Sequence, residues 1–389
     1  MIIKTSKYHP KLFSDRPYQM CSKTVMDTTD VNIYFDEDGV SNHYFEYKKE
    51  AETQLLKEPE RTKALNETLD QIKANGNGKR YDCLIGLSGG VDSSYVAWLV
   101  KQYGLRPLAV HLDNGWNSEL AVHNVNNIIE TLGFDLHTIV VNWEEFRDLQ
   151  LSYLKASVID IEVVSDHAIQ ATMFQLASKF NIDYIISGTN IVTEYILPSS
   201  WIYPKLDFTN LSSIHKKFGS YKLKTYPHVP FYKYIRYTGF QKLKPFSILD
   251  YVDYNKKDVL PILENKLGWR NYGGKHCESL WTKFYQNYIL PAKFGVDKRK
   301  AHLSTLVCSG QMTREAALKE LEKPIYDKEE LANDTEYVLK KLVLSQNEFE
   351  AIMNTPPIPH EFYGTHAHYK KYYKFLLDTT KPIRKAFKK

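Results

Sequence analysis

The chain has 389 residues, enough for one large core with smaller additions around it. Its 51 Lys and Arg against 46 Asp and Glu leave a net charge of +5, which does not demand nucleic acid, and no such partner is expected. No apolar run approaches the roughly 18 to 20 residues that cross a bilayer, and four unevenly spaced cysteines without a signal peptide favour a cytoplasmic protein.

Residues 1–78 are predicted to form a separate lead-in domain. It holds a short strand candidate from Val31 to Phe35 and a charged helical stretch from about Glu46 to Lys73. The glycine-rich turn from Asn75 to Gly78 closes it.

Cys21 and the turn at Gly39 resemble one edge of a two-knuckle zinc site. Such a site needs about four ligands in paired spacing. Thr24, Ser41 and Tyr44 stand at the other positions, so the knuckle is degenerate and no zinc site is expected. His43 leaves open whether another metal binds in this region.

The most informative stretch runs from Tyr81 to Val100. An apolar run leads into Ser88-Gly89-Gly90 and continues with helical spacing, which predicts a strand, a tight glycine loop and a helix. Adjacent glycines let the backbone approach a ligand, and the first N–H groups of a helix attract anions. The loop is not a Walker A motif, because no lysine enters it.

Strands and helices alternate beyond this point. Further strands are predicted at Arg106 to Asn114, Leu136 to Val141 and Tyr184 to Ser187, and Ser165-Asp166-His167 is expected to open a helix. The pattern predicts an α/β fold with a doubly wound parallel sheet over residues 79–325, with ligands beyond the carboxyl ends of its strands.

Two additions to this domain are predicted. Residues 195–247, rich in Pro, Tyr, Phe and Lys, are interpreted as an insertion that either covers the site and recognises a substrate or partner, or is a structural flap. Residues 326–389 are predicted to be a helical C-terminal extension.

The run Ser88-Gly89-Gly90-Val91-Asp92-Ser93-Ser94 resembles the pyrophosphate loop of the PP-loop ATP pyrophosphatases, a superfamily with an adenine nucleotide alpha hydrolase-like fold that includes GMP, NAD and asparagine synthetases. The resemblance implies that ATP is cleaved between the α and β phosphates and that AMP passes to a substrate oxygen. It implies ATP and Mg²⁺ as cofactors, with Asp92 near the magnesium. The residues then expected to bind ATP are Leu87, Ser88, Gly89, Gly90, Val91, Ser93, Ser94, Leu112, Asp113, Ser187, Gly188, Thr189 and Asn190.

Other polar residues are candidates for chemistry. Asp166 and His167 at a helix start either orient a nucleophile and act as a base, or merely cap the helix together with Ser165. Cationic side chains would neutralise pyrophosphate or the diphosphate of a sugar nucleotide. The catalytic candidates are Asp92, Asp166, Lys275 and Arg299, the substrate contacts are Arg270, His276 and His167, and further cations are Lys298, Lys300 and His302.

Several stretches together resemble the N-acetyl sugar amidotransferases of bacterial surface-polysaccharide and flagellin-glycan pathways. They are Val25 to Asp30, Asp36 to Val40, the loop itself, Asp166 to Ile169, Ser187 to Asn190, Tyr272 to His276 and Cys308 to Arg314. The resemblance implies that the acetamido group of a nucleotide-linked sugar is adenylated and that ammonia converts it to an acetamidino group. It also implies a separate glutaminase and cyclase pair that supplies ammonia, similar to the histidine-pathway enzymes.

Two other functions stay open. A tRNA-modifying PP-loop ATPase would share the loop but should carry a stronger basic surface or paired cysteines. A non-catalytic scaffold that binds nucleotide is the alternative outside enzymology. The sequence leaves open which sugar is modified and whether the chain forms a homo-oligomer.

Overall fold

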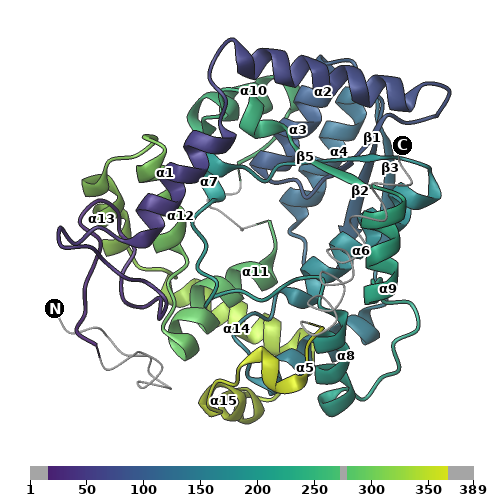
Figure 1. Cartoon of the computed structure of the whole chain (residues 1–389). Helices are drawn as coiled ribbons and strands as arrows, with labels where there is room; N and C mark the ends of the chain where they lie inside the picture. Colours follow the sequence, from purple (N-terminus) through teal and green to yellow (C-terminus); the bar gives the residue numbers. More distant parts are fainter. Residues whose placement is uncertain (1–15, 272–277, 367–389) are drawn as a thin grey trace, which may run out of the picture.

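The computed structural model describes residues 16–271 and 278–366. Within these residues the centre is a sheet of five parallel strands in the order β3-β2-β1-β4-β5 (Figure 1). The strands are β1 (Cys83–Gly86), β2 (Pro107–Asp113), β3 (Asp135–Val140), β4 (Tyr184–Ser187) and β5 (Lys244–Ser247). The central strand β1 is apolar and buried, as expected of a parallel strand covered on both faces.

Helices cover both faces of the sheet, because successive strand residues point to opposite sides. Leu84 and Leu108 pack with α6 (Val163–Lys179) on one face. Ile85 and Ala109 belong to a different cluster on the other face. That cluster is completed by α2 (Glu60–Gly76), α3 (Val91–Gln102), α4 (Glu119–Leu132) and α10 (Lys256–Leu267). The predicted doubly wound α/β fold is confirmed.

The strand order reverses beside β1. The chain passes from β1 to β2 and β3 on one side, then to β4 and β5 on the other. Ligands of open α/β sheets bind at such a reversal, beyond the carboxyl ends of the strands. The loops after β1 and β4 come close together here, since a Cβ added to Gly188 would lie 3.1 Å from the backbone carbonyl carbon of Asp92.

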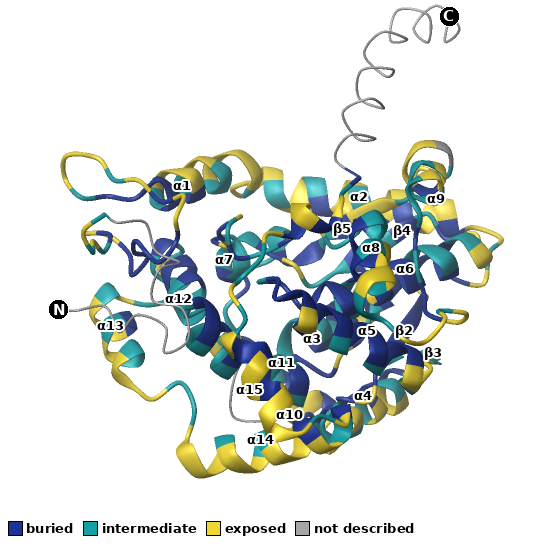
Figure 2. Ribbon diagram, turned by 90° about the horizontal axis from the view of Figure 1, so that it is seen from below, coloured by how far each residue is buried: buried dark blue, intermediate teal, exposed yellow. Residues whose placement is uncertain are grey.

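A second core lies at the opposite end of the molecule from α2 (Figure 1). Trp116, after β2, stacks on Trp281 with ring centroids 5.4 Å apart. Figure 2 shows α5 largely buried and the outer side of α14 exposed. The helices of this core are α5 (Trp143–Ala156), α8 (Phe208–Phe218), α11 (Leu280–Phe284), η3 (Tyr285–Phe294), α12 (Arg299–Cys308), α14 (Lys328–Leu342) and α15 (Gln346–Asn354), followed by η4 (His360–Tyr363).

The N-terminal residues pack on the rest of the chain. Val25 lies in one cluster with Leu303 of α12 and Ala317 of α13 (Arg314–Glu322). The single helical stretch predicted from Glu46 is two helices, α1 (Asn42–Gln54) and α2, separated before Pro59, because proline disfavours helix at the preceding residue. Since α2 belongs to the core of the sheet, the boundary expected at residue 78 falls inside a continuous core.

Residues 195–247 contain α8, α9 (Phe231–Ile235) and η1 (Arg236–Phe240), and they end in β5. They follow α7 (Ile191–Glu194) and precede η2 (Ile248–Tyr251). The last residues of the predicted insertion are therefore the edge strand of the sheet. The sequence Lys-Pro-Phe-Ser gives little strand signal, and Pro245 is tolerated because an edge strand needs only one row of hydrogen bonds.

Candidate active site

The loop after β1 is held open by its glycines and fixed on both sides. Gly89 has φ +83°, and a Cβ there would lie 2.5 Å from the carbonyl oxygen of Ala121 on α4. The indole Nε1 of Trp269 donates to the Gly89 carbonyl at 2.8 Å. Any side chain at position 89 would displace the loop, so glycine is required.

The hydroxyls of the loop form a small network. The Oγ atoms of Ser88 and Ser93 lie 3.0 Å apart, and the Gly90 amide donates to Ser88 at 3.2 Å. Gly90 precedes Val91 as the N-cap of α3, and no side chain caps that helix. The helix start therefore offers an anion N–H groups and two hydroxyls. Ser94 is buried and donates to the Gly90 carbonyl at 2.7 Å, so it supports the loop.

The loop after β4 adds further hydroxyls. Ser187 and Thr189 lie 2.6 Å apart, and Thr189 lies 3.0 Å from Ser247 at the end of β5. Asn190 instead caps α7, accepting from the Thr193 amide at 2.8 Å. Ser247 was not predicted, because β5 was not recognised as a strand. The loops Ser88 to Ser94 and Ser187 to Asn190, with Ser247, are called the nucleotide edge below.

The two residues predicted to bind nucleotide at the end of β2, Leu112 and Asp113, have different roles. Leu112 lines the cavity described below, whereas Asp113 accepts from the Gly115 amide at 2.9 Å and stabilises the turn. Buried His111 was missed by the sequence analysis. Its Nδ1 donates to the Leu87 carbonyl at 2.8 Å and its Nε2 accepts from Asn117 at 3.1 Å, which ties β1 to β2 beneath the loop.

Asp92 is engaged by residues that follow β5. Tyr254 donates a hydrogen bond to one carboxylate oxygen, and Lys256 lies 3.3 Å from the other. Asp92 is absent from the cavity lining. A magnesium ion that used Asp92 would compete with both partners, so this carboxylate fits the predicted metal role poorly.

Asp250, which follows β5, fits a cation on ATP better. It lines the cavity and accepts from the Ile191 amide at 2.8 Å, and no Lys, Arg or His pairs with it in the described part of the chain. Burial raises the pKa of Asp250. A divalent cation would offset the cost of burying the charged carboxylate. Magnesium suits this position, since it binds through one or two carboxylates and the substrate phosphates.

A cavity of about 840 Å³ joins the nucleotide edge to the C-terminal helices. Ser88, Ser93 and Thr189 line one end. The lining at the other end comes from the start of α6, from the segment after α7, and from residues 278–302. One chamber can thus take a nucleotide and a second substrate.

The second end is built on paired charges. Lys205 lies 2.7 Å from Asp160 and 2.9 Å from Asp166, while Lys298 lies 3.2 Å from Glu162. Burial alone would lower the pKa of Lys205, but the carboxylates of Asp166, Asp160 and Glu162 outweigh it and raise that pKa. These five residues, Asp160, Glu162, Asp166, Lys205 and Lys298, are called the acidic wall below.

Asp166 does not cap α6, which was one of the two roles left open for it. The helix α6 begins at Val163, so Asp166 and Ser165 lie in its first turn, where the helix dipole favours an anion. Asp166 lines the cavity and its side chain is 39% exposed. The structure therefore presents this candidate to a ligand.

His167 is turned away from the cavity lining and is fully buried. Its Nδ1 donates to the Lys205 carbonyl at 2.8 Å, and its Nε2 accepts from the Val229 amide at 3.1 Å. Burial lowers the pKa of His167 to about 4. Contact with substrate is incompatible with this position, and the residue fastens segment 195–247 to α6.

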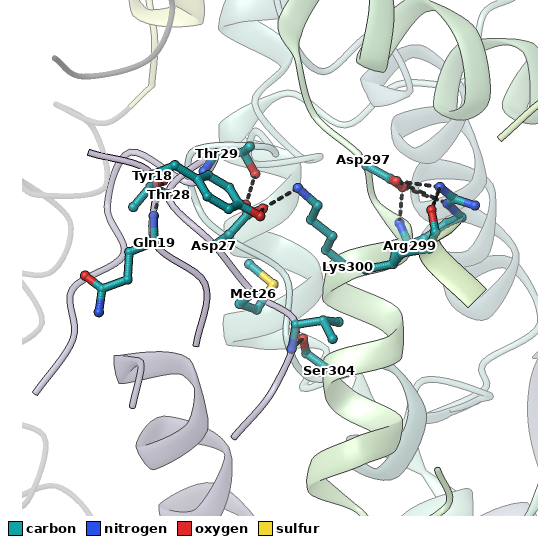
Figure 3. Close-up of polar contacts among 12 residues, drawn as sticks. Tyr18, Gln19, Met26, Asp27, Thr28, Thr29, Asp297, Arg299, Lys300 and Ser304 are labelled. Atoms are coloured by element: carbon teal, nitrogen blue, oxygen red, sulfur yellow. Dashed lines mark hydrogen bonds and ion pairs between the residues drawn. The ribbon is translucent and has the colours of Figure 1, made fainter. Parts of the chain in front are cut away.

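The cations expected to bind a diphosphate are already paired. Figure 3 shows Lys300 directed at the buried carboxylate of Asp27 and Arg299 at Asp297. The Arg299 guanidinium also donates to the Lys323 carbonyl at 3.0 Å. Arg299 lines the cavity, but its guanidinium is occupied by contacts that join α12 to the end of α13. This arrangement argues against the predicted catalytic role. His302 donates from Nδ1 to the Thr193 carbonyl at 3.0 Å.

The remaining candidates lie near the gap in the described residues. Arg270 is fixed through its backbone to Asn124 and is absent from the cavity lining. Lys275 and His276 lie outside the described residues.

The degenerate knuckle is held by protein hydrogen bonds. Cys21 Sγ accepts from the Ser41 amide at 3.2 Å. Arg314 donates to the carbonyls of Cys21 and Thr24, each at 3.0 Å. These bonds join the N-terminal turn to α13.

Two family models match this chain. Residues 278–377 match "LPS biosynthesis protein WbpG-like, C-terminal domain" and residues 61–230 match "NAD synthase". An uncharacterized protein from Methanocaldococcus jannaschii is 25% identical over 278 residues, covering 71% of this chain and 85% of that protein.

Two further relatives match shorter parts of the chain. A tRNA-specific 2-thiouridylase from Fusobacterium nucleatum is 25% identical over 140 residues, 34% of this chain and 39% of that protein. A glutamine-dependent NAD(+) synthetase from Aquifex aeolicus is 25% identical over 175 residues, 41% of this chain and 30% of that protein.

The sheet order, the glycine loop and the NAD synthase match define the class, a PP-loop ATP pyrophosphatase of the kind found in ATP-using ligases. The C-terminal match then narrows it. Together the two matches are consistent with the predicted WbpG-type member of this superfamily. No helix within the described ranges is long and apolar enough to cross a membrane.

Proposed function

We propose that this chain is an ATP-dependent amidotransferase that adenylates the acetamido group of a nucleotide-linked sugar and uses ammonia to form an acetamidino group. The reaction would serve bacterial surface-polysaccharide or flagellin-glycan synthesis in the cytoplasm. The carrying observation is a cavity of about 840 Å³ whose lining joins the nucleotide edge to residues 278–302 of the WbpG-like match.

The chemistry needs both ends of this cavity. An amide carbonyl is a poor electrophile, and bound ATP supplies the AMP that makes its oxygen a leaving group. The loop amides and the hydroxyls of Ser88 and Ser93 would hold the pyrophosphate in line with that oxygen. Asp250 would hold the accompanying magnesium.

The acidic wall would stabilise the positive charges that form during the proposed reaction. Adenylation of a neutral amide gives a cationic imidate, and the amidine product is also a cation near neutral pH. Three carboxylates and two lysines leave the wall with an excess of negative charge. Cations are stabilised beside such a surface, whereas a diphosphate is repelled. The sugar and its acetamido group would therefore face the wall.

Product analysis with a substrate carrying heavy oxygen in the acetamido carbonyl tests this function. The purified chain is incubated with ATP, magnesium, ammonium and a panel of nucleotide-linked acetamido sugars. We expect AMP and pyrophosphate in equal amounts, with the heavy oxygen in AMP. Release of ADP, or label that stays in the sugar, would refute the proposal, and nucleotide binding without turnover would identify a scaffold.

The nitrogen source is proposed to be a separate glutaminase and cyclase pair, because the sequence shows no recognisable glutaminase arrangement. The purified chain should use ammonium but not glutamine. Turnover with glutamine alone would contradict the need for a partner. Whether copies of the chain associate is checked in the same preparation by light scattering.

A further inference from the structure

The acidic wall contains a half-buried lysine between two carboxylates of unequal exposure. Lys205 lies 2.7 and 2.9 Å from the oxygens of Asp160, whose side chain is 1% exposed, and 2.9 Å from Oδ2 of Asp166, which is 39% exposed. Asp160 also accepts from the Tyr203 amide at 2.8 Å. Asp160 is thus a fixed anchor, and Asp166 is the member that a ligand reaches.

Glu162 is less suited to meet a ligand. Its side chain is 11% exposed, and Oε2 accepts from Gln286 at 2.9 Å and from Lys298 at 3.2 Å. Of the three carboxylates on this wall, Asp166 combines exposure to the cavity with a single ionic partner.

We propose that Lys205, anchored by Asp160, is a positioning residue that holds Asp166 as an anion at the cavity surface, and that Asp166 accepts the proton ammonia loses when it adds to the activated carbonyl carbon. The role of Asp166 rests on the proposed function. The ion pair of Lys205 with Asp166, called the clamp below, can be measured without it.

The step balances as follows. The lone pair of ammonia forms the new C–N bond while the C=N pair of the cationic imidate moves to the sugar nitrogen. The added nitrogen now carries a positive charge, and one of its protons passes to the Asp166 carboxylate. The C–O bond to AMP then breaks, its electron pair leaves with AMP, and a C=N bond re-forms. The amidinium cation remains, and Asp166 returns its proton to solvent.

Asp166 lies among other carboxylates, and two positive features lie beside it. Lys205 offsets the repulsion from neighbouring carboxylates, and the start of α6 adds its positive dipole end. The charged and titratable groups around Asp166 are Asp160, Glu162, Lys205, Lys298, Tyr226 and Tyr285.

Two half-reactions separate the roles. ATP–pyrophosphate exchange in the presence of the sugar reports adenylation, and amidine formation requires ammonia. We expect Asp166→Asn to lower exchange only through the lost charge of the wall, and to lower amidine formation by at least about a hundredfold more than exchange, the usual contribution of a general base. Equal loss of both activities would overturn the assignment of Asp166 to the ammonia step.

The clamp is tested by the ionisation of Asp166. Infrared difference spectra between each protein and its Asp166→Asn counterpart isolate that carboxylate during a pH titration. Lys205→Met should raise its midpoint by about one pH unit or more, and Lys205→Arg should restore it. The acid limb of amidine formation should move with it. An unchanged midpoint in Lys205→Met would refute the clamp.

Two further variants keep the result interpretable. Lys205→Met leaves Asp160 buried without a cation, so the double variant Lys205→Met/Asp160→Asn is measured as well. Its rise should be smaller than in Lys205→Met, because the repulsion between Asp160 and Asp166 is removed too. Lys283→Met is the matched control, since Lys283 also bridges two carboxylates, Glu330 and Asp334, outside the cavity lining. A wild-type protein with no exchange would reject the proposed function, while the titration would still decide the clamp.

Discussion

The nucleotide edge and the acidic wall face each other across one cavity but are built differently. At the nucleotide edge, short loops after β1 and β4 supply backbone amides and hydroxyls from residues close in sequence. At the acidic wall, Asp160, Lys205 and Lys298 come from distant parts of the chain. A phosphate cradle therefore has a local signature, whereas a wall for a particular substrate is assembled only by folding.

The largest effect is expected at Gly89. Gly89→Ala places a methyl group 2.5 Å from the Ala121 carbonyl and should lower ATP–pyrophosphate exchange by at least about a hundredfold, because small displacements in a site have large kinetic effects. Calorimetric titration with ATP measures the lost binding. Gly78→Ala is the control, since Gly78 has a similar φ of +73° with no atom within 4 Å of the added Cβ.

Gly78→Ala should lose only about 1 kcal/mol of stability, the strain of a left-handed backbone, and should bind ATP normally. Equal loss of ATP binding in both variants would refute the claim that the close contact at Gly89 shapes the nucleotide site.

Lowering the pH should reduce the free energy of unfolding through two buried histidines near the acidic wall. Burial lowers the pKa of His167 and of His360 to about 4, below the 6.5 of an ordinary histidine. Between these values the unfolded chain binds more protons than the folded chain, so stability falls as pH drops from 6.5 toward 4. Urea unfolding at pH 7 and pH 5 should differ by about 2 kcal/mol per histidine. The loss should shrink in His360→Gln, and an unchanged loss would exclude His360.

Arg299 distinguishes a structural cation from a catalytic one. Arg299→Ala removes the pair with Asp297 and the bond to the Lys323 carbonyl, so it should lower stability by about 1 to 2 kcal/mol. The KM for ATP and the exchange rate should change less than about threefold at 20 °C or below, where the fold persists. Thermal melting and exchange assays measure the two effects. A hundredfold loss of exchange in a folded variant would restore the catalytic role predicted for Arg299.

The smallest effect is expected from a single hydroxyl. Thr189→Val removes the link between Ser187 and Ser247 without changing side-chain shape, and should slow exchange by about fivefold to tenfold, the equivalent of one hydrogen bond. Steady-state kinetics measure it. Thr193→Val is unsuitable as a control because Thr193 belongs to the α7 cap, so Thr68→Val on the outer side of α2 serves instead.

These differences also explain what sequence could and could not predict. The loop at Ser88 to Ser94 and the alternation of strands were readable because each depends on neighbours in the chain. Lys205 gave no signal, since its partners lie in another segment, and Arg299 gave a misleading one, since a basic triplet does not show that each member is already paired. His167 was ambiguous for the same reason. Its backbone partners, from Lys205 and Val229, are local only in three dimensions.

The helix α6 connects the two ends of the cavity. Its first turn carries Asp166, and its later turns pack through Met173 and Leu176 against the sheet that bears the glycine loop. In the proposed reaction, this one helix would set the distance between the phosphorus that is attacked and the carboxylate that takes the proton. A sugar whose acetamido group is attached one bond further along the ring would then bind without bringing its amide oxygen to the phosphorus.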